Sequence, residues 1–329
     1  MNTNMSGIAA SQKGVKKTGI LVLGTFLQEM VRRWPFYLMI LPGMLYIFIF
    51  NYLPMFGAVI AFKEYNPVKG VWGSDWIGFK NFEFFFKSDA AWRVTFNTIS
   101  YNLIILVLVT AISVLFAILL QETGSRIRTG FYKSVMLLPF FLSWVVGEYL
   151  VYALLNPDQG LVNGIRTSFG LEPINWYSEP FYWRFIMPLA YLLKQVGYTS
   201  VIYVAAITGI SSDYYEAAEI DGASKWQKAR YITIPLLMPV VFIMMLLSLG
   251  KIFNGGLGDW GAFYNLPRES GILFSTTDVI DTYVFRSLRT VNDIGMSSAV
   301  GLYQAVVGLV LVLISNYLVK KYDSDSSLF

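Results

Sequence analysis

The sequence contains no cysteine and no histidine among its 329 residues. The absence of cysteine excludes disulfides, a thiol nucleophile and thiolate ligands for a metal. The absence of histidine removes the side chain that proteins use most often as a general base and as a metal ligand. Acid–base or metal chemistry would have to rest on carboxylates, lysines and tyrosines. We therefore expect no catalytic site, no metal site and no cofactor in this chain.

Charged residues are also scarce, at 14% of the chain, whereas hydrophobic residues make up 55% and the mean hydropathy is +0.53. An average soluble domain has about 25% charged residues. The net charge of +4 is small and needs no nucleic-acid partner to explain it. The apolar residues gather in separate runs long enough to cross a bilayer, which takes about 20 helical residues. The composition predicts an all-α integral membrane protein.

Six apolar runs predict six transmembrane helices. They are expected at about 37–62, 98–120, 135–155, 185–210, 236–253 and 296–319. Residues 1–36 are expected to form a cytoplasmic tail that ends in a surface helix over 20–31, which is too short to span. A signal peptide is the alternative, but Gln28, Glu29, Arg32 and Arg33 stand where a cleavage site of small residues would be.

The orientation follows from the basic residues next to the spans. Arg32-Arg33 precede the first span and Lys320-Lys321 follow the last one. A short basic turn over 121–133 lies on the same side of the predicted topology. Both termini, including the tail 320–329, and the loop 211–235 are therefore expected in the cytoplasm. Residues 63–93 are expected to form an ordered extracytoplasmic loop.

The polar stretch from Ser211 to Pro239 stands out between two apolar runs. Its acids come first and its bases follow, which suits the dipole of a short helix. Asp213-x-x-Glu216 is close to a capping box, so Asp213 is expected to cap the helix. Gly222 can adopt the left-handed conformation that ends it. The pattern predicts a helix, a glycine bend and a second helix over 225–231 at a membrane surface.

The spacing within this stretch resembles a known motif. Glu216-Ala217-Ala218, three residues, Gly222, nine residues and Ile232-x-Ile234-Pro235 resembles the EAA motif of binding-protein-dependent ABC importer permeases. The family usually has leucine where this chain has Ile234. The resemblance implies that the stretch is the cytoplasmic coupling helix, which docks into a cleft of the ATPase subunit. The implied coupling residues are Asp213, Glu216, Ala217, Ala218 and Gly222.

Further patches extend the resemblance over nearly the whole chain from about Trp34. Leu41-Pro42-Gly43, Ala61–Pro67, Trp76–Phe82 and Ser298–Gln304 are similar to permease subunits that serve complex oligosaccharides and polysaccharide fragments. This branch implies a type I importer core of five helices within residues 94–319, with the first span, 37–62, as an appendage. It also implies a bacterial cytoplasmic membrane as the location.

The resemblance implies partners as well. They are an ABC ATPase dimer, a second permease subunit that is a different chain, an extracytoplasmic solute-binding protein and an oligosaccharide substrate. The sequence has no Gly-Lys-Ser/Thr phosphate-binding loop, so ATP hydrolysis would reside in the ATPase. The chain itself is expected not to be an enzyme.

Ionisable residues inside the predicted spans are candidates for the substrate path, because a charge at bilayer depth needs a polar cavity or a partner. Glu148 and Lys194 either line this path or pair with each other, and Lys251 either lines it or extends to the membrane surface. Aromatic rings share helix faces with the first two, and tyrosines suit sugar rings and hydroxyls. The candidate path residues are Trp144, Glu148, Tyr149, Tyr152, Tyr191, Lys194 and Tyr198.

Other functions remain open from the residues alone. The same importer architecture serves peptides or amino acids, which uptake assays would distinguish from sugars. A membrane-embedded glycosyltransferase or hydrolase would show turnover without an ATPase, and a gated channel would show flux without ATP. The missing histidine and cysteine weigh against the enzyme.

Overall fold

The computed structural model of the protein describes residues 32–123, 125–252 and 261–322. The surface helix expected over residues 20–31 lies outside this part of the chain. Within it, five helices are long and apolar enough to cross a membrane, and one bent pair of helices can supply a sixth span. The prediction of an all-α membrane protein with six spans is confirmed, although one span is broken.

The chain divides into two compact units, residues 1–59 and 60–329. The described part of the first unit contains α2 (Trp34–Ile47), the π-helical turn η1 (Phe48–Tyr52), α3 (Leu53–Met55) and the first residues of a 3-10 helix. At the end of η1 the N–H of Leu53 bonds to the carbonyl of Phe48, five residues back. This wide turn directly precedes Pro54, which has no N–H to donate, so the helix is irregular at this proline.

A 3-10 helix, η2 (Phe56–Phe62), leads into a small hairpin at the start of the second unit. Strand β1 (Lys63–Glu64) pairs antiparallel with β2 (Asp75–Trp76), and α4 (Gly70–Gly73) lies between them. The Lys63 side chain is buried, and its Nζ donates to the carbonyl oxygens of residues 71 and 72 at 2.9 and 3.1 Å. These bonds order the hairpin, and α5 (Lys80–Phe86) follows it.

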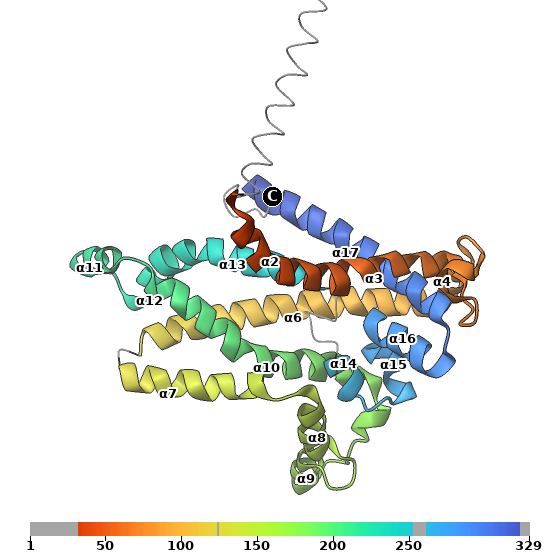
Figure 1. The fold of residues 1–329 in the computed structure, drawn as a ribbon. Helices are drawn as coiled ribbons and strands as arrows, with labels where there is room; N and C mark the ends of the chain where they lie inside the picture. Colours follow the sequence, from red (N-terminus) through yellow and green to blue (C-terminus); the bar gives the residue numbers. More distant parts are fainter. Residues whose placement is uncertain (1–31, 124, 253–260, 323–329) are drawn as a thin grey trace, which may run out of the picture. The chain divides into compact units, whose positions relative to one another are not determined.

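Four long helices form the body of the second unit (Figure 1). They are α6 (Asp89–Gln121), α10 (Pro180–Thr208), α13 (Ile234–Leu249) and α17 (Ile294–Tyr322). α6 and α10 pack along each other with small and hydroxyl residues at the contact, as is common between membrane helices. Ser113 of α6, for example, is fully buried and its Oγ donates to the carbonyl oxygen of Val196 at 3.2 Å.

The predicted third span, 135–155, is two helices rather than one. α7 (Arg126–Leu137) continues as the 3-10 turn η3 (Leu138–Phe141), and α8 (Trp144–Leu155) then leaves at an angle of 97°. The segment 121–133, predicted as a turn, is therefore mostly helical. Two further elements follow α8 before α10 begins: α9 (Leu161–Ser168) and η4 (Trp176–Ser178).

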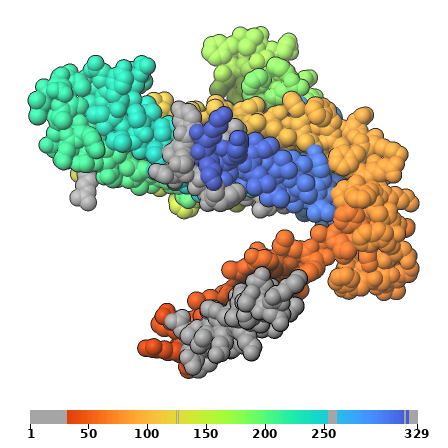
Figure 2. All heavy atoms as spheres, turned by 90° about the horizontal axis from the view of Figure 1, so that it is seen from above, coloured from red at the N-terminus to blue at the C-terminus, as the bar shows by residue number. Residues whose placement is uncertain are grey.

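The coupling stretch connects α10 to α13. It contains α11 (Ser212–Ile220), α12 (Lys225–Lys228) and the π-helical turn η5 (Ala229–Thr233), which runs directly into α13. Figure 2 shows this stretch, coloured green to cyan, at one end of the second unit, and the orange segment that contains the hairpin and α5 at the other. If the predicted orientation holds, these are the cytoplasmic and extracytoplasmic ends.

The region 254–295, which lies between the fifth and sixth predicted spans, is largely helical where it is described. Its elements are α14 (Gly261–Asn265), η6 (Gly271–Leu273), α15 (Phe274–Thr277), α16 (Ile280–Arg286) and η7 (Ser287–Val291). The fully buried carboxylate of Asp278 organises them, because it accepts from Arg286 at 2.6 Å and from Thr282 at 2.8 Å. The Asn97 side chain of α6 donates to the Asp278 carbonyl at 2.9 Å, which ties these short helices to α6.

Candidate functional site

The end of α11 is defined by backbone hydrogen bonds at Gly222. This residue has φ of +75°, as predicted, and its N–H bonds to the carbonyl of Glu219 at 3.0 Å. The next N–H, from Ala223, reaches back to the carbonyl of Ala218 at 2.9 Å. This pair of bonds is the Schellman motif, which satisfies the last carbonyls of a helix. The chain therefore reverses at a fixed angle between α11 and α12.

The residue that caps the start of α11 differs from the prediction. The hydroxyl of Ser211 accepts from the N–H of Asp213 at 3.3 Å. Asp213 is not the cap but an acid in the first turn, where the helix dipole favours it. A capping box does occur one helix later, where Ser224 and Gln227 exchange bonds of 2.7 and 3.4 Å at the start of α12.

One side-chain contact joins α11 to α12, and two more hold this pair to the ends of the membrane helices. Lys228 pairs with Glu219 of α11 at 2.6 Å, and the Tyr215 hydroxyl lies 3.0 Å from that of Thr233. Lys225 pairs with Glu122, just beyond α6, at 2.8 Å. The hydrogen bond from Lys228 holds the pKa of Glu219 below its usual value. Glu122 in turn raises the pKa of Lys225. The bent segment is therefore tied to α6 and α13 rather than hanging free.

The opposite face of α11 has no contacts to the described part of this chain. Asp213, Glu216, Ala217 and Ile220 are spaced i, i+3, i+4 and i+7, so they lie on one side of the helix. All four are exposed, and the Ile220 side chain is 88% accessible. This face of α11 therefore offers two carboxylates and one apolar side chain to a protein partner. Sequence reasoning missed Ile220, although its place on the Glu216 face was visible from the helical spacing.

Within the membrane region, Lys194 lies at the break between η3 and α8. Its Nζ donates to the carbonyl oxygen of Phe140 at 3.1 Å and also to that of Leu142. The ammonium lies 5.2 Å from the ring centre of Trp144. Tyr198, one turn further along α10, stacks on the Phe140 ring with 4.4 Å between centroids. Together the two side chains satisfy and cover backbone groups that the bend frees.

Glu148 does not pair with Lys194, which was one of the two interpretations of these charges. Its carboxylate lies 3.2 Å from Nε of Arg268, and the Arg268 guanidinium stacks on Tyr152 at 4.1 Å. Arg268 and the following Glu269 both have positive φ, at 55° and 53°. Such conformations are uncommon for residues other than glycine. The ion pair links α8 to this left-handed segment, which the sequence did not suggest.

The remaining predicted path residues separate. Tyr191 is fully buried and Trp144 is 8% exposed, and their rings contact each other at 4.9 Å inside the core around Tyr101 and Phe263. Tyr149 is 63% exposed. The structure therefore places the seven candidates in four kinds of surroundings: the bend, the ion pair, the core and the surface.

A cavity of about 150 Å³ lies between α6, α10 and α13. Tyr198 is the one predicted path residue that lines it. The others on its wall are Leu106, Val109, Thr110, Gln195, Thr199, Tyr203, Met244, Ser248 and Lys251. Hydroxyl and amide groups therefore face the cavity together with two tyrosine rings, and Lys251 supplies an ammonium. No aspartate or glutamate of the described chain lines it.

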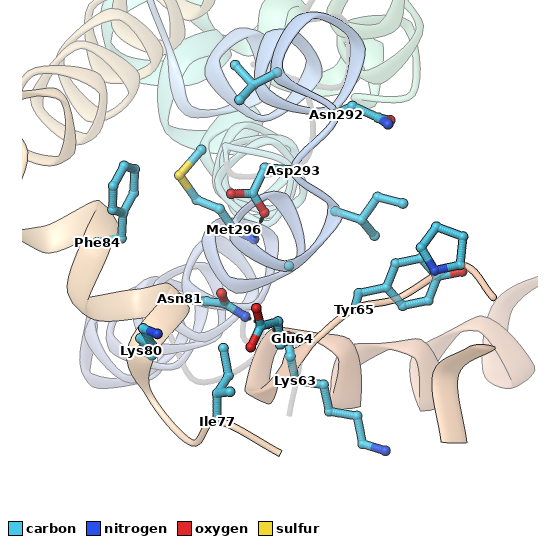
Figure 3. Close-up of a pocket in the computed structure, with 14 residues that line it drawn as sticks. Lys63, Glu64, Tyr65, Ile77, Lys80, Asn81, Phe84, Asn292, Asp293 and Met296 are labelled. Atoms are coloured by element: carbon cyan, nitrogen blue, oxygen red, sulfur yellow. Dashed lines mark hydrogen bonds between the residues drawn. The ribbon is translucent and has the colours of Figure 1, made fainter. Parts of the chain in front are cut away.

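A second hollow, of about 500 Å³, opens at the end opposite α11, between β1, α5 and the start of α17 (Figure 3). Asn81 fixes two of these parts, because its Nδ2 donates to the carbonyl oxygens of Ala61 and Lys63, both at 3.0 Å. Asp293 caps α17 by accepting from the N–H of Met296 at 2.8 Å. The charged residues on the wall carry both signs: Glu64, Lys80 and Asp293 are among them. In the described part of the chain no cluster of acidic residues could hold a metal ion.

Comparison with known proteins gives consistent matches. A family model described as "Binding-protein-dependent transport system inner membrane component" matches residues 90–324. The chain is 32% identical over 297 residues to the polygalacturonan/rhamnogalacturonan transport system permease protein YteP of Bacillus subtilis (strain 168). That alignment covers 90% of this chain and 91% of the relative.

Two solved structures are also similar. One is a bacterial ABC transporter involved in the import of the acidic polysaccharide alginate. One of its chains is 30% identical with a TM-score of 0.82, covering 91% of this chain and 99% of that one. The other is a bacterial alginate ABC transporter in complex with an alginate pentasaccharide-bound periplasmic protein, at 29% identity and a TM-score of 0.81. It covers 90% of this chain and 97% of that one.

Proposed function

Because the chain belongs to the family of binding-protein-dependent transport system inner membrane components, we propose that it is one of two permease chains in an ATP-driven importer of oligosaccharides or polysaccharide fragments. The family that the EAA motif predicted is thereby confirmed. The importer would reside in the bacterial cytoplasmic membrane. An ATPase dimer, a second permease and an extracytoplasmic solute-binding protein would complete it, and the ATPase would carry out the hydrolysis.

The coupling role is supported by the exposed face of α11. Its carboxylates and Ile220 are free to enter a cleft of the ATPase, while Lys228 and Tyr215 hold the other face to α12 and α13. A movement of the ATPase would therefore be transmitted to the membrane helices with little loss in the linking segment. ATP drives this cycle only if it binds one state of the ATPase dimer better than the other. The membrane helices would then change the side to which their cavity opens.

The cargo proposal is supported by the cavity between α6, α10 and α13. Tyr198 and Tyr203 present aromatic rings for the C–H faces of a sugar, and Gln195, Thr199 and Ser248 present groups that can bond its hydroxyls. Lys251 adds a positive charge with no acid on the wall beside it, so the cavity suits a sugar that carries carboxylates. The relatives named for galacturonan and for alginate transport are consistent with this cargo.

The binding protein would dock at the end opposite α11, where the hollow around Asn81 opens. The periplasmic protein in the alginate complex is consistent with such a partner. Among the observations, the exposed face of α11 carries the proposal furthest, because its residues stand where the EAA motif places the contact with the ATPase.

The test is reconstitution of this chain with the second permease, the ATPase and the binding protein in liposomes. ATP-dependent uptake of a labelled oligogalacturonate, absent when the ATPase is omitted, is the expected result. Uptake of peptides instead of sugars would show that the cargo is a peptide, and flux without ATP would indicate a channel.

A further inference from the structure

A hollow of about 490 Å³ lies beside the extracytoplasmic end of α6, and the proposed function does not use it. Two arginines line it, Arg93 from α6 and Arg184 from the second turn of α10, and no acidic side chain of the described residues does. The rings of Trp92 and Phe96 lie next to them, stacked with 6.0 Å between centroids. The hollow therefore combines positive charge with aromatic surface.

The positive charge of this hollow is only partly neutralised. Arg184 is exposed and makes no ion pair with the described part of the chain. Arg93 lies 3.7 Å from the carboxylate of Asp278, but Arg286 already binds the same oxygen at 2.6 Å. The buried carboxylate of Asp278 thus pairs with both Arg93 and Arg286. Arg184 pairs with no acid of the described chain. An anion bound in the hollow would complete this charge balance.

The hollow faces away from the proposed cargo cavity. Successive residues of a helix are about 100° apart, so Arg93, Ser100 and Ile104 lie on one face of α6 and Leu106 and Val109 on the opposite face. The second set lines the cargo cavity, and Leu106 and Val109 are 5% and 8% exposed. An anion in the hollow would therefore not lie in the cargo path.

The face of α6 below the hollow is apolar and exposed. Phe96, Ile104, Val107 and Leu115 follow the face of Arg93 toward the cytoplasmic end, and each is about half exposed. From Trp92 to Leu115 the helix covers about 35 Å, close to the thickness of the hydrocarbon core, about 30 Å. Trp92 and the arginines then stand at the level of the lipid headgroups, where tryptophan is enriched and where an arginine side chain can keep its guanidinium in a polar environment.

We propose that this hollow binds the headgroup of an anionic phospholipid from the outer leaflet. The lipid phosphate would accept hydrogen bonds from Arg93 and Arg184. Its acyl chain would lie along Phe96 and Ile104. Charge complementarity selects an anionic lipid such as phosphatidylglycerol over a zwitterionic one, because the ammonium of phosphatidylethanolamine has no acid to pair with here.

The test uses the assembled transporter in nanodiscs of phosphatidylethanolamine and phosphatidylglycerol at 3:1, followed by native mass spectrometry. We expect the variant Arg184→Gln to retain one phosphatidylglycerol fewer per copy of this chain. The double variant Arg93→Gln/Arg184→Gln should show this loss in a larger share of the complexes. Lys87→Gln removes an exposed cation outside the hollow and should retain the wild-type number. Arg184→Lys should restore much of the retention.

Equal retention of phosphatidylglycerol by wild type and Arg184→Gln would overturn the proposal. A photoreactive benzoylphenylalanine in place of Phe96 provides the second measurement. It should form an adduct with the mass of a phospholipid. An adduct with the second permease or with the oligosaccharide would show that this face is an interface or a cargo path instead, and would equally overturn the lipid assignment. Neither measurement depends on transport, so the proposed function can fail while this site stands.

Discussion

Gly197 in α10 lies directly against the backbone of Met136 in α7, and a Cβ at this glycine would overlap the Met136 carbonyl oxygen. The contact lets the two helices approach closely just before α7 ends at the break in the third span. The neighbouring Ser200 is buried and bonds back to the Val196 carbonyl at 2.6 Å. Small residues on α10 thus determine where α7 lies.

The first prediction follows from this contact. Gly197→Ala forces α7 and α10 apart, and such overpacking costs about 1–3 kcal/mol. We expect the purified transporter to unfold at a lower temperature, as measured by the loss of monodisperse protein on heating. Gly164→Ala in α9 is the matched control, because nothing lies within 4 Å of its added methyl group. If both variants melt like the wild type, the close approach of α7 and α10 is not important for stability.

The second prediction concerns the bend between η3 and α8. Lys194→Met removes the ammonium that serves the carbonyls of Phe140 and Leu142. At the depth of the bilayer a carbonyl left without a donor finds no water to bond, which costs about 1–3 kcal/mol, so the thermal stability of the transporter should fall. Lys194→Arg keeps donors in reach and should lose less. Should Lys194→Met unfold at the wild-type temperature yet fail in uptake, Lys194 would belong to the cargo path and not to the bend.

The elements that could be predicted from the sequence are those specified by residues close together in the chain. Six apolar runs and the spacing from Glu216 to Pro235 were sufficient for the membrane fold, the family and the bend at Gly222. The cap of α11 was assigned to Asp213 instead of Ser211 because serine and aspartate are both good caps and stand two residues apart. Only the backbone geometry decides between them.

The features that the sequence did not predict depend on residues far apart in the chain. The break in the third span is stabilised by Lys194, which is 54 residues beyond Phe140. The short helices after residue 260 are held by Asp278 and by contacts to α6, such as the 2.9 Å bond from the Ile280 N–H to Thr98. No local periodicity marks such helices. Likewise Glu148 pairs with Arg268, which lies outside the predicted spans. A search limited to charges within the spans therefore did not find this partner.

The third prediction tests the role of Lys251 in the proposed cargo cavity. The wild-type importer should take up oligogalacturonate in preference to the same oligomer with methyl-esterified carboxylates, which has equal rings and no charge. Lys251→Met should reduce this preference by about tenfold, the equivalent of 1.4 kcal/mol, mainly through a higher KM for the acid. An unchanged ratio in the variant would mean that Lys251 extends to the membrane surface and does not contact cargo.

The last prediction concerns the bend that aims α11. Gly222 has φ of +75°, and a methyl group added to it would meet no neighbour within 4 Å, so a substitution here acts through the backbone alone. Gly222→Val places a β-branched residue in the left-handed region, at a cost of about 1–3 kcal/mol. The Schellman bonds at the end of α11 should open, and the face with Glu216 and Ile220 should no longer be held toward the ATPase.

Gly222→Asn is the matched control, because asparagine tolerates the left-handed conformation at a helix end. It should retain the ATPase on co-purification and sustain uptake near the wild-type rate. Gly222→Val should insert normally but lose uptake, either with less bound ATPase or with hydrolysis uncoupled from transport. Ile220→Ser keeps the bend and removes the apolar contact, so it should weaken ATPase retention without changing the fold. A normally bound ATPase and full transport in both Gly222→Val and Ile220→Ser would contradict this prediction. Coupling would then require neither the bend nor the apolar contact, and α11 would not be the coupling element.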